Sequence, residues 1–176
     1  MFLHRLLTGK PIKSAARRLC DTAVAQGRQP ALYARMGAPD SVEGRFEILT
    51  LHVILLLDRL RSAGPEAGAV GQALFDVYLS DLDAALREMS VGDLAVGKRM
   101  KKLGQVFYGR ARAYREAFAV LPDTATLEAV VARTLLDGVA DGDPGPLAAY
   151  VARAREALAA SAADSLLAGS AAWPTP

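Results

Sequence analysis

The side chains best suited to chemistry are two histidines, His4 and His52, and one cysteine, Cys20. His52 lies seven residues from both Arg45 and Arg59. Residues seven apart share a face of a helix, so these three would form a polar seam able to bind an anionic group or a partner's carboxylate. The alternative is that this seam is the solvent edge of the helix, with His52 hydrogen-bonded to the backbone. The two arginines would also disfavour the charged form of His52, which weakens a role in proton transfer.

A second candidate is the stretch between Asp93 and Glu116, which contains no acid. It carries seven basic residues: Lys98, Arg99, Lys101, Lys102, Arg110, Arg112 and Arg115. Helical geometry places these charges opposite or beside the apolar stripe of the helix, so they would point outward. Such a face is either simply solvated or a contact for RNA, anionic lipid or an acidic protein. Phe107 falls on the core side and Tyr108 lies laterally, which argues against stacking on bases.

A third candidate is the amino-terminal segment, which is basic and partly apolar. The first 20 residues contain no acid, and their basic residues are Arg5, Lys10, Lys13, Arg17 and Arg18. Apolar residues accompany them at Phe2, Leu3, Leu6 and Leu7. Such a segment can lie at an anionic membrane surface, and the alternative is an ordinary first helix.

Motifs of known enzyme classes are absent from the sequence. There is no G-x-S-x-G, H-E-x-x-H, P-loop or C-x-x-C pattern. Acidic pairs seven apart occur at residues 76–88, but they lack a histidine or a third ligand for a metal. The longest apolar run is residues 53–57, or 49–57 if Thr50 and His52 are tolerated, and both are well short of the roughly 20 residues that span a bilayer. We therefore expect a soluble intracellular protein that is not an enzyme and has no metal site and no cofactor.

The elements that would position these residues are helices. Apolar residues make up 52% of the 176 residues and are mostly Ala and Leu at helical spacing. The pattern predicts helices near residues 11–27, 32–36, 42–62, 66–90, 94–120, 124–136 and 146–167. We expect an all-α, single-domain helical bundle or orthogonal array of about six or seven helices. Its parts would be a basic helical segment (1–28), a helical domain (29–168) and a flexible tail (169–176).

Helix ends and pairing follow from the same patterns. Asp40 or Ser41 is a suitable N-cap for the helix at 42–62, and Asp93 for the helix at 94–120. The acidic helix at 66–90 and the basic helix that follows are joined by a tight turn. They should therefore pack antiparallel, with part of the basic charge neutralised internally.

Two stretches carry a family resemblance. They are GAPDSVEGRFEILTLHVILLLDRL (residues 37–60) and ALFDVYLSDLDAALREMSVGDLAVGKRMKKLGQVFYGRARAY (residues 73–114). Together they resemble the ubiquinol–cytochrome c chaperone family over roughly residues 30–118. The most specific parts are DAALREMSVGDLAVGKRMK and the FYGR that follows. The first 25 residues and the Ala-rich tail contribute little to the resemblance.

The resemblance implies an all-helical, non-enzymatic assembly factor for ubiquinol–cytochrome c reductase that holds newly made cytochrome b. Mitochondrial relatives work with a small partner protein and bind near the ribosome exit tunnel. This chain has no evident mitochondrial presequence and resembles a bacterial member, for which we expect a cytoplasmic location with peripheral association to the inner membrane. No DNA partner is expected. The alternative is a helical adaptor that binds a ribosome, RNA or an anionic membrane through its basic face.

No catalytic residue is carried over from the family. The positions that match it are Arg45, Phe46, His52, Asp93, Lys98, Lys101, Lys102, Phe107, Tyr108 and Arg110. The candidate partner-binding residues are these positions with two changes. Arg99 is added from the basic face, and Asp93 is left out because it is the expected helix cap. Positive charge would place the protein beside an anionic membrane or ribosome, while an apolar groove engages the client.

Overall fold

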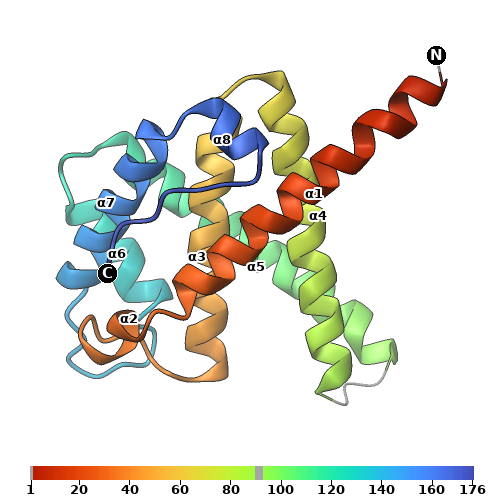
Figure 1. Ribbon diagram of the computed structural model, residues 1–176. Coiled ribbons are helices and arrows are strands. Elements are labelled where there is room, and N and C mark those ends of the chain that lie inside the picture. The colour runs from red at the N-terminus through yellow and green to blue at the C-terminus, as the bar shows by residue number, and fades with distance from the viewer. Residues whose placement is uncertain (1, 90–92) are drawn as a thin grey trace.

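The computed structural model describes residues 2–89 and 93–176, with side chains for residues 10–89 and 95–176. Over these residues the chain is all-α, which confirms the expected fold class (Figure 1). The helices are α1 (Phe2–Gly27), α2 (Pro30–Ala34), α3 (Val42–Arg61), α4 (Pro65–Glu88), α5 (Asp93–Ala119), α6 (Ala125–Thr134), α7 (Gly145–Ala160) and α8 (Ala163–Leu167). None of the described helices combines the length and apolar character needed to cross a membrane.

The central helix is α3, because apolar residues surround it through its middle. Residues 50–56 are all buried there, and helices α1, α4, α5 and α7 pack around it. Its start is set by Ser41, whose Oγ accepts a hydrogen bond from the Gly44 backbone N–H at 3.0 Å. This confirms the expected N-cap. Helix α1 runs diagonally across α3 and α4, and its amino-terminal end projects beyond the rest of the molecule (Figure 1).

Helices α4 and α5 form a hairpin, in which the carboxyl end of α4 and the amino end of α5 extend away from α6 and α7 (Figure 1). The two helices run antiparallel as expected (Figure 1), and the rings of Phe75 and Phe107 pack between them with centroids 4.8 Å apart. The acids of α4 do not pair with the basic residues of α5 in the described contacts. Asp81 instead pairs with Arg17 of α1 at 2.6 Å, and Asp83 pairs with Arg87 of its own helix at 2.7 Å.

Several helix ends differ from those expected. Helix α1 begins at Phe2, so Pro11 lies inside it, although a proline there cannot donate the backbone hydrogen bond of its helical turn. The expected helix at 146–167 is two helices, because Ser161 is extended (ψ 134°). The tight turn was expected at residues 90–93, with Asp93 as the N-cap. Asp93 is the first residue of α5, but its side chain and residues 90–92 lie outside the described part of the chain.

The carboxyl-terminal segment packs on the helices rather than forming the flexible tail expected for residues 169–176. Trp173 donates from Nε1 to Thr22 Oγ1 at 3.3 Å, and Gln26 donates from Nε2 to the Pro174 carbonyl at 2.8 Å. Gly169 begins this segment with a φ of +82°, where Arg18 and Ala15 of α1 leave no room for a Cβ. A glycine at this position therefore allows the chain to turn closely against α1.

Candidate functional site: an apolar groove and a basic helix face

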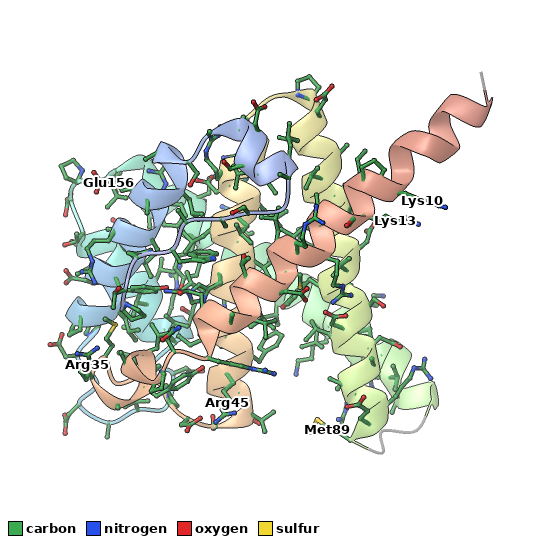
Figure 2. The ribbon with its side chains drawn as sticks, viewed as in Figure 1. Lys10, Lys13, Arg35, Arg45, Met89 and Glu156 are labelled. Atoms are coloured by element: carbon green, nitrogen blue, oxygen red, sulfur yellow. The ribbon has the colours of Figure 1, made fainter. Side chains whose placement is uncertain are left out.

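The polar seam of α3 does not form a binding surface. His52 is completely buried, whereas Arg45 is exposed and pairs with Asp40 at 2.6 Å. Figure 2 shows Arg45 near the start of α3, away from the α4–α5 hairpin. Arg59 donates to the backbone carbonyls of residues 158 and 161, at 3.0 and 2.8 Å. These carbonyls lie at the carboxyl end of α7, where the helix itself provides no hydrogen-bond donors for them. The three side chains therefore have separate structural contacts. The prediction that this seam is the solvent edge of the helix is wrong at His52, which is buried.

His52 is held as a neutral ring by hydrogen bonds on both nitrogens. Nδ1 lies 2.7 Å from the Ile48 carbonyl, which can only accept, so Nδ1 carries the proton. Nε2 then accepts from the Tyr150 hydroxyl at 2.7 Å, and that hydroxyl accepts from Gln26 at 2.9 Å. Burial lowers the pKa of His52 to about 4, although the hydrogen bond to Ile48 opposes the shift. The predicted backbone hydrogen bond is confirmed, but burial rather than the arginines disfavours the charged ring.

The first half of α5 presents an exposed basic face. Its side chains at Lys98, Arg99, Lys101 and Lys102 are all exposed. Within the described part of the chain, none of these four makes an ion pair. We call these four residues the basic face. Its position agrees with the outward direction expected from helical spacing.

The later basic residues of α5 behave differently. Arg110 is half-buried and donates from Nε and Nη2 to the two carboxylate oxygens of Glu47 on α3, at 3.1 and 3.0 Å. This bidentate hydrogen bond raises the pKa of Arg110, although burial opposes the shift. Arg112 pairs with Glu116 one turn along α5 at 2.9 Å. Arg110 therefore ties α5 to α3, and it does not belong to the exposed face.

An apolar groove of about 310 Å³ opens between α3, α4 and α5. The walls are lined by Ile54, Leu57, Asp58, Leu60 and Arg61 of α3, by Gly68, Gly71, Gln72 and Phe75 of α4, and by Phe107, Tyr108, Ala111, Arg115 and Phe118 of α5. We call this feature the groove. Its lining combines apolar and aromatic side chains with few polar groups, which is typical of sites that bind apolar ligands or segments.

Aromatic rings form one wall of the groove. Phe75 contacts Phe107 and Tyr108, with centroids 4.8 and 5.7 Å apart, and Phe107 also contacts Tyr78 at 5.5 Å. Phe107 is 3% exposed and belongs to the core, whereas Tyr108 is 64% exposed. An aromatic side chain this exposed beside an apolar groove is a strong candidate contact for a partner.

Two of the candidate residues, Phe107 and Tyr108, therefore come together at the groove. Phe46 is half-buried and packs against the core. The groove's walls on α3 and α4 were not found from the sequence, because their apolar residues were assigned to the core. One signal of the groove was present in the sequence, the Gly68–Gly71 pair on α4. A Cβ at Gly68 would meet nothing within 4 Å, so core packing does not require a glycine at this position. In the described part of the chain, no cluster of His, Cys, Asp or Glu could hold a metal.

Comparison with known proteins identifies the family. A model of the ubiquinol–cytochrome c chaperone family matches residues 34–173. The chain belongs to this family. The match extends beyond the roughly 30–118 expected, into the carboxyl-terminal segment that packs on α1 and α3.

Two chaperone relatives support the assignment. The chain is 24% identical over 166 residues to ubiquinol-cytochrome-c reductase complex assembly factor 1 of Xenopus laevis, covering 92% of this chain and 82% of that protein. The crystal structure of a Cbp3 homologue from Brucella abortus is similar with a TM-score of 0.86 and 33% identity, covering 99% of this chain and 97% of the other. The helical arrangement, including α1, is therefore shared with this crystal structure.

Proposed function

We propose that this protein is a non-enzymatic assembly chaperone for ubiquinol–cytochrome c reductase, and that its groove holds an apolar segment of newly made cytochrome b. Membership of the chaperone family supports the assembly role. The groove supports the mode of binding, because an apolar channel with the exposed ring of Tyr108 at its mouth offers a partner both buried area and a contact. This open groove is the observation on which the proposal depends.

Filling the groove from within should test this mode of binding. Gly68 lines the groove, and open space surrounds the position of its Cβ. Gly68→Leu should therefore occupy the groove without a clash, and the helix should gain about 1 kcal/mol of stability because glycine is a poor helix former. We expect the variant to lose at least tenfold in the cytochrome b that co-purifies with the tagged protein, while its Tm is unchanged or higher.

The matched control is Gly109→Leu, since Gly109 also faces open space on a helix but does not line the groove. It should retain cytochrome b. Equal capture by both variants would contradict the groove as the client site. The function itself is tested separately: a strain lacking the gene should contain less assembled reductase at unchanged transcript levels. Normal reductase in that strain would contradict the assembly role.

We also propose that the basic face docks the protein, at the cytoplasmic side of the inner membrane, to an anionic membrane or ribosome surface. The support is four exposed cations within five residues that have no ion pair in the described structure. Such a face attracts phosphate groups and releases their counterions, so binding should weaken steeply as salt rises. A small partner protein is also compatible with this role, as the family resemblance implies.

Charge reversal tests the docking. Lys98→Glu/Lys101→Glu/Lys102→Glu should reduce co-sedimentation with ribosomes and with phosphatidylglycerol vesicles at least tenfold at low salt, because each reversed charge now repels phosphate. The control is Arg28→Glu/Arg133→Glu/Arg153→Glu, which changes the net charge equally at exposed positions on other helices and loops. Equal loss of co-sedimentation in both variants would mean that only the net charge of the protein matters. Unchanged co-sedimentation of the first variant would exclude the basic face as the docking surface.

A further inference from the structure

We infer that the groove selects apolar segments that carry acidic residues at their ends and rejects those with basic ends. This inference rests on the proposed client-binding role of the groove and defines the chemistry of the segment that it accepts. It depends on the balance of charge around the groove and on the line of side chains along α5.

The negative charge of the acidic residue in the groove is already neutralised by ion pairs within the protein. Asp58 is the one acidic residue in the described lining. Its carboxylate accepts from Arg61 Nη2 at 2.9 Å and from Arg155 Nε at 3.3 Å. Arg155 is also positioned by Phe118, with its guanidinium carbon 5.0 Å from the ring centroid. Two guanidinium groups therefore share one carboxylate, and no unpaired acid remains in the lining to attract a basic segment.

The cation that remains is Arg115. It lines the groove from α5, its side chain is exposed, and the described structure gives it no ion pair. The neighbouring acid, Glu116, is paired with Arg112. With Asp58 compensated by Arg61 and Arg155, the lining presents a net positive charge to an incoming segment. A carboxylate near Arg115 would be attracted, and an ammonium or guanidinium would be repelled.

A second cation lies further along the same side of α5. Lys101, Tyr108 and Arg115 are spaced seven apart, so they share one face of this continuous helix. Lys101 and Arg115 are both exposed, and Tyr108 lies between them at the mouth of the groove. Fourteen residues of helix span about 21 Å. An apolar segment that lies along α5 over Tyr108 would therefore have a cation near each end.

Charge complementarity of this kind adds specificity to apolar binding. Each exposed ion pair tightens binding by only about 1.4- to fivefold, and a repulsive end weakens binding by a similar factor. Two ends together give a preference of roughly tenfold, since about 1.4 kcal/mol corresponds to one decade in Kd. The preference should decrease with salt, whereas the apolar contribution should not.

The test uses two labelled peptides that share one apolar Leu/Ala helix of 14 residues and differ only in two Asp or two Lys at each end. Fluorescence anisotropy with the full-length protein should show roughly tenfold tighter binding of the Asp-ended peptide at low salt. Lys101→Glu/Arg115→Glu should reverse this preference. Arg28→Glu/Arg133→Glu, which makes the same change of charge at exposed positions outside the groove and the basic face, should retain it.

Each other outcome overturns the inference. The two peptides could bind equally well, with Gly68→Leu abolishing the binding of both. The groove would then remain a client site, but it would have no charge selectivity. Reversal by both double variants would assign the preference to overall charge. Failure of both peptides to bind would contradict the groove as a site for apolar segments. Tighter binding of monododecyl phosphate than of the Asp-ended peptide, abolished by Gly68→Leu, would make the occupant a lipid instead.

Discussion

Gly44→Ala is expected to destabilise the protein by about 3 kcal/mol, at the upper end of the usual range for overpacked core positions. A Cβ at this position would clash with the carbonyl oxygen of Pro39 and would also meet the Pro39 carbonyl carbon at 2.9 Å. These are backbone atoms, so no rotamer change can relieve the clash. Relief requires the loop between α2 and α3 to move.

The surrounding structure resists such a movement. Ala38 is buried and donates its backbone N–H to the Leu32 carbonyl at 3.1 Å, which holds the loop on α2. The Gly44 N–H is itself bound by the N-cap Ser41. Displacing the loop would therefore break the cap of the central helix as well. This combination explains why the expected loss is larger than for a typical surface substitution.

Urea unfolding measures the effect, with Gly109→Ala as the control. Gly109 is also a helical glycine, but a Cβ there meets nothing within 4 Å. The control should gain about 1 kcal/mol, because alanine forms helices better than glycine does. If Gly44→Ala had the same midpoint and slope as the wild type, the close approach between Pro39 and α3 would not exist in solution.

The second large effect is a loss of stability in acid that depends on His52. The folded pKa is lowered to about 4, whereas an ordinary histidine titrates near 6.5. Between these two values the unfolded chain binds a proton that the folded protein does not, so the free energy of unfolding falls as the pH falls. One pKa unit corresponds to about 1.4 kcal/mol, so His52 accounts for a loss of about 3 kcal/mol between pH 6.5 and pH 4.

The comparison with His52→Gln isolates this contribution. Glutamine does not titrate, and it can donate to one neighbour and accept from another, as the ring does between Ile48 and Tyr150. All other titratable groups are the same in the two proteins, so their contribution cancels in the comparison. Urea unfolding from pH 7 to pH 4 should therefore show a steeper decline for the wild type. Parallel declines would mean that His52 titrates normally, and its ring NMR signals would then move near pH 6.5.

The helices and the direction of the basic face could be predicted from the sequence, because both depend on neighbours along the chain. The Ser41 cap is a contact over three residues. The exposure of Lys98, Lys101 and Lys102 follows from their position opposite the apolar stripe of the same helix. The family could also be recognised from the sequence, since the stretches at residues 37–60 and 73–114 carry the resemblance and lie within the residues that the family model matches.

Only the tertiary structure decided which polar residues remain available to a partner. Arg110 and Lys102 look alike in the sequence, but Arg110 meets Glu47, 63 residues away, and is withdrawn from the surface. His52 is buried with Tyr150, 98 residues away, and beside Trp173 of the terminal segment. The groove likewise needs three helices to be brought together. Spacing along the chain determines which face of a helix a residue occupies, but burial and pairing depend on which other helix covers that face.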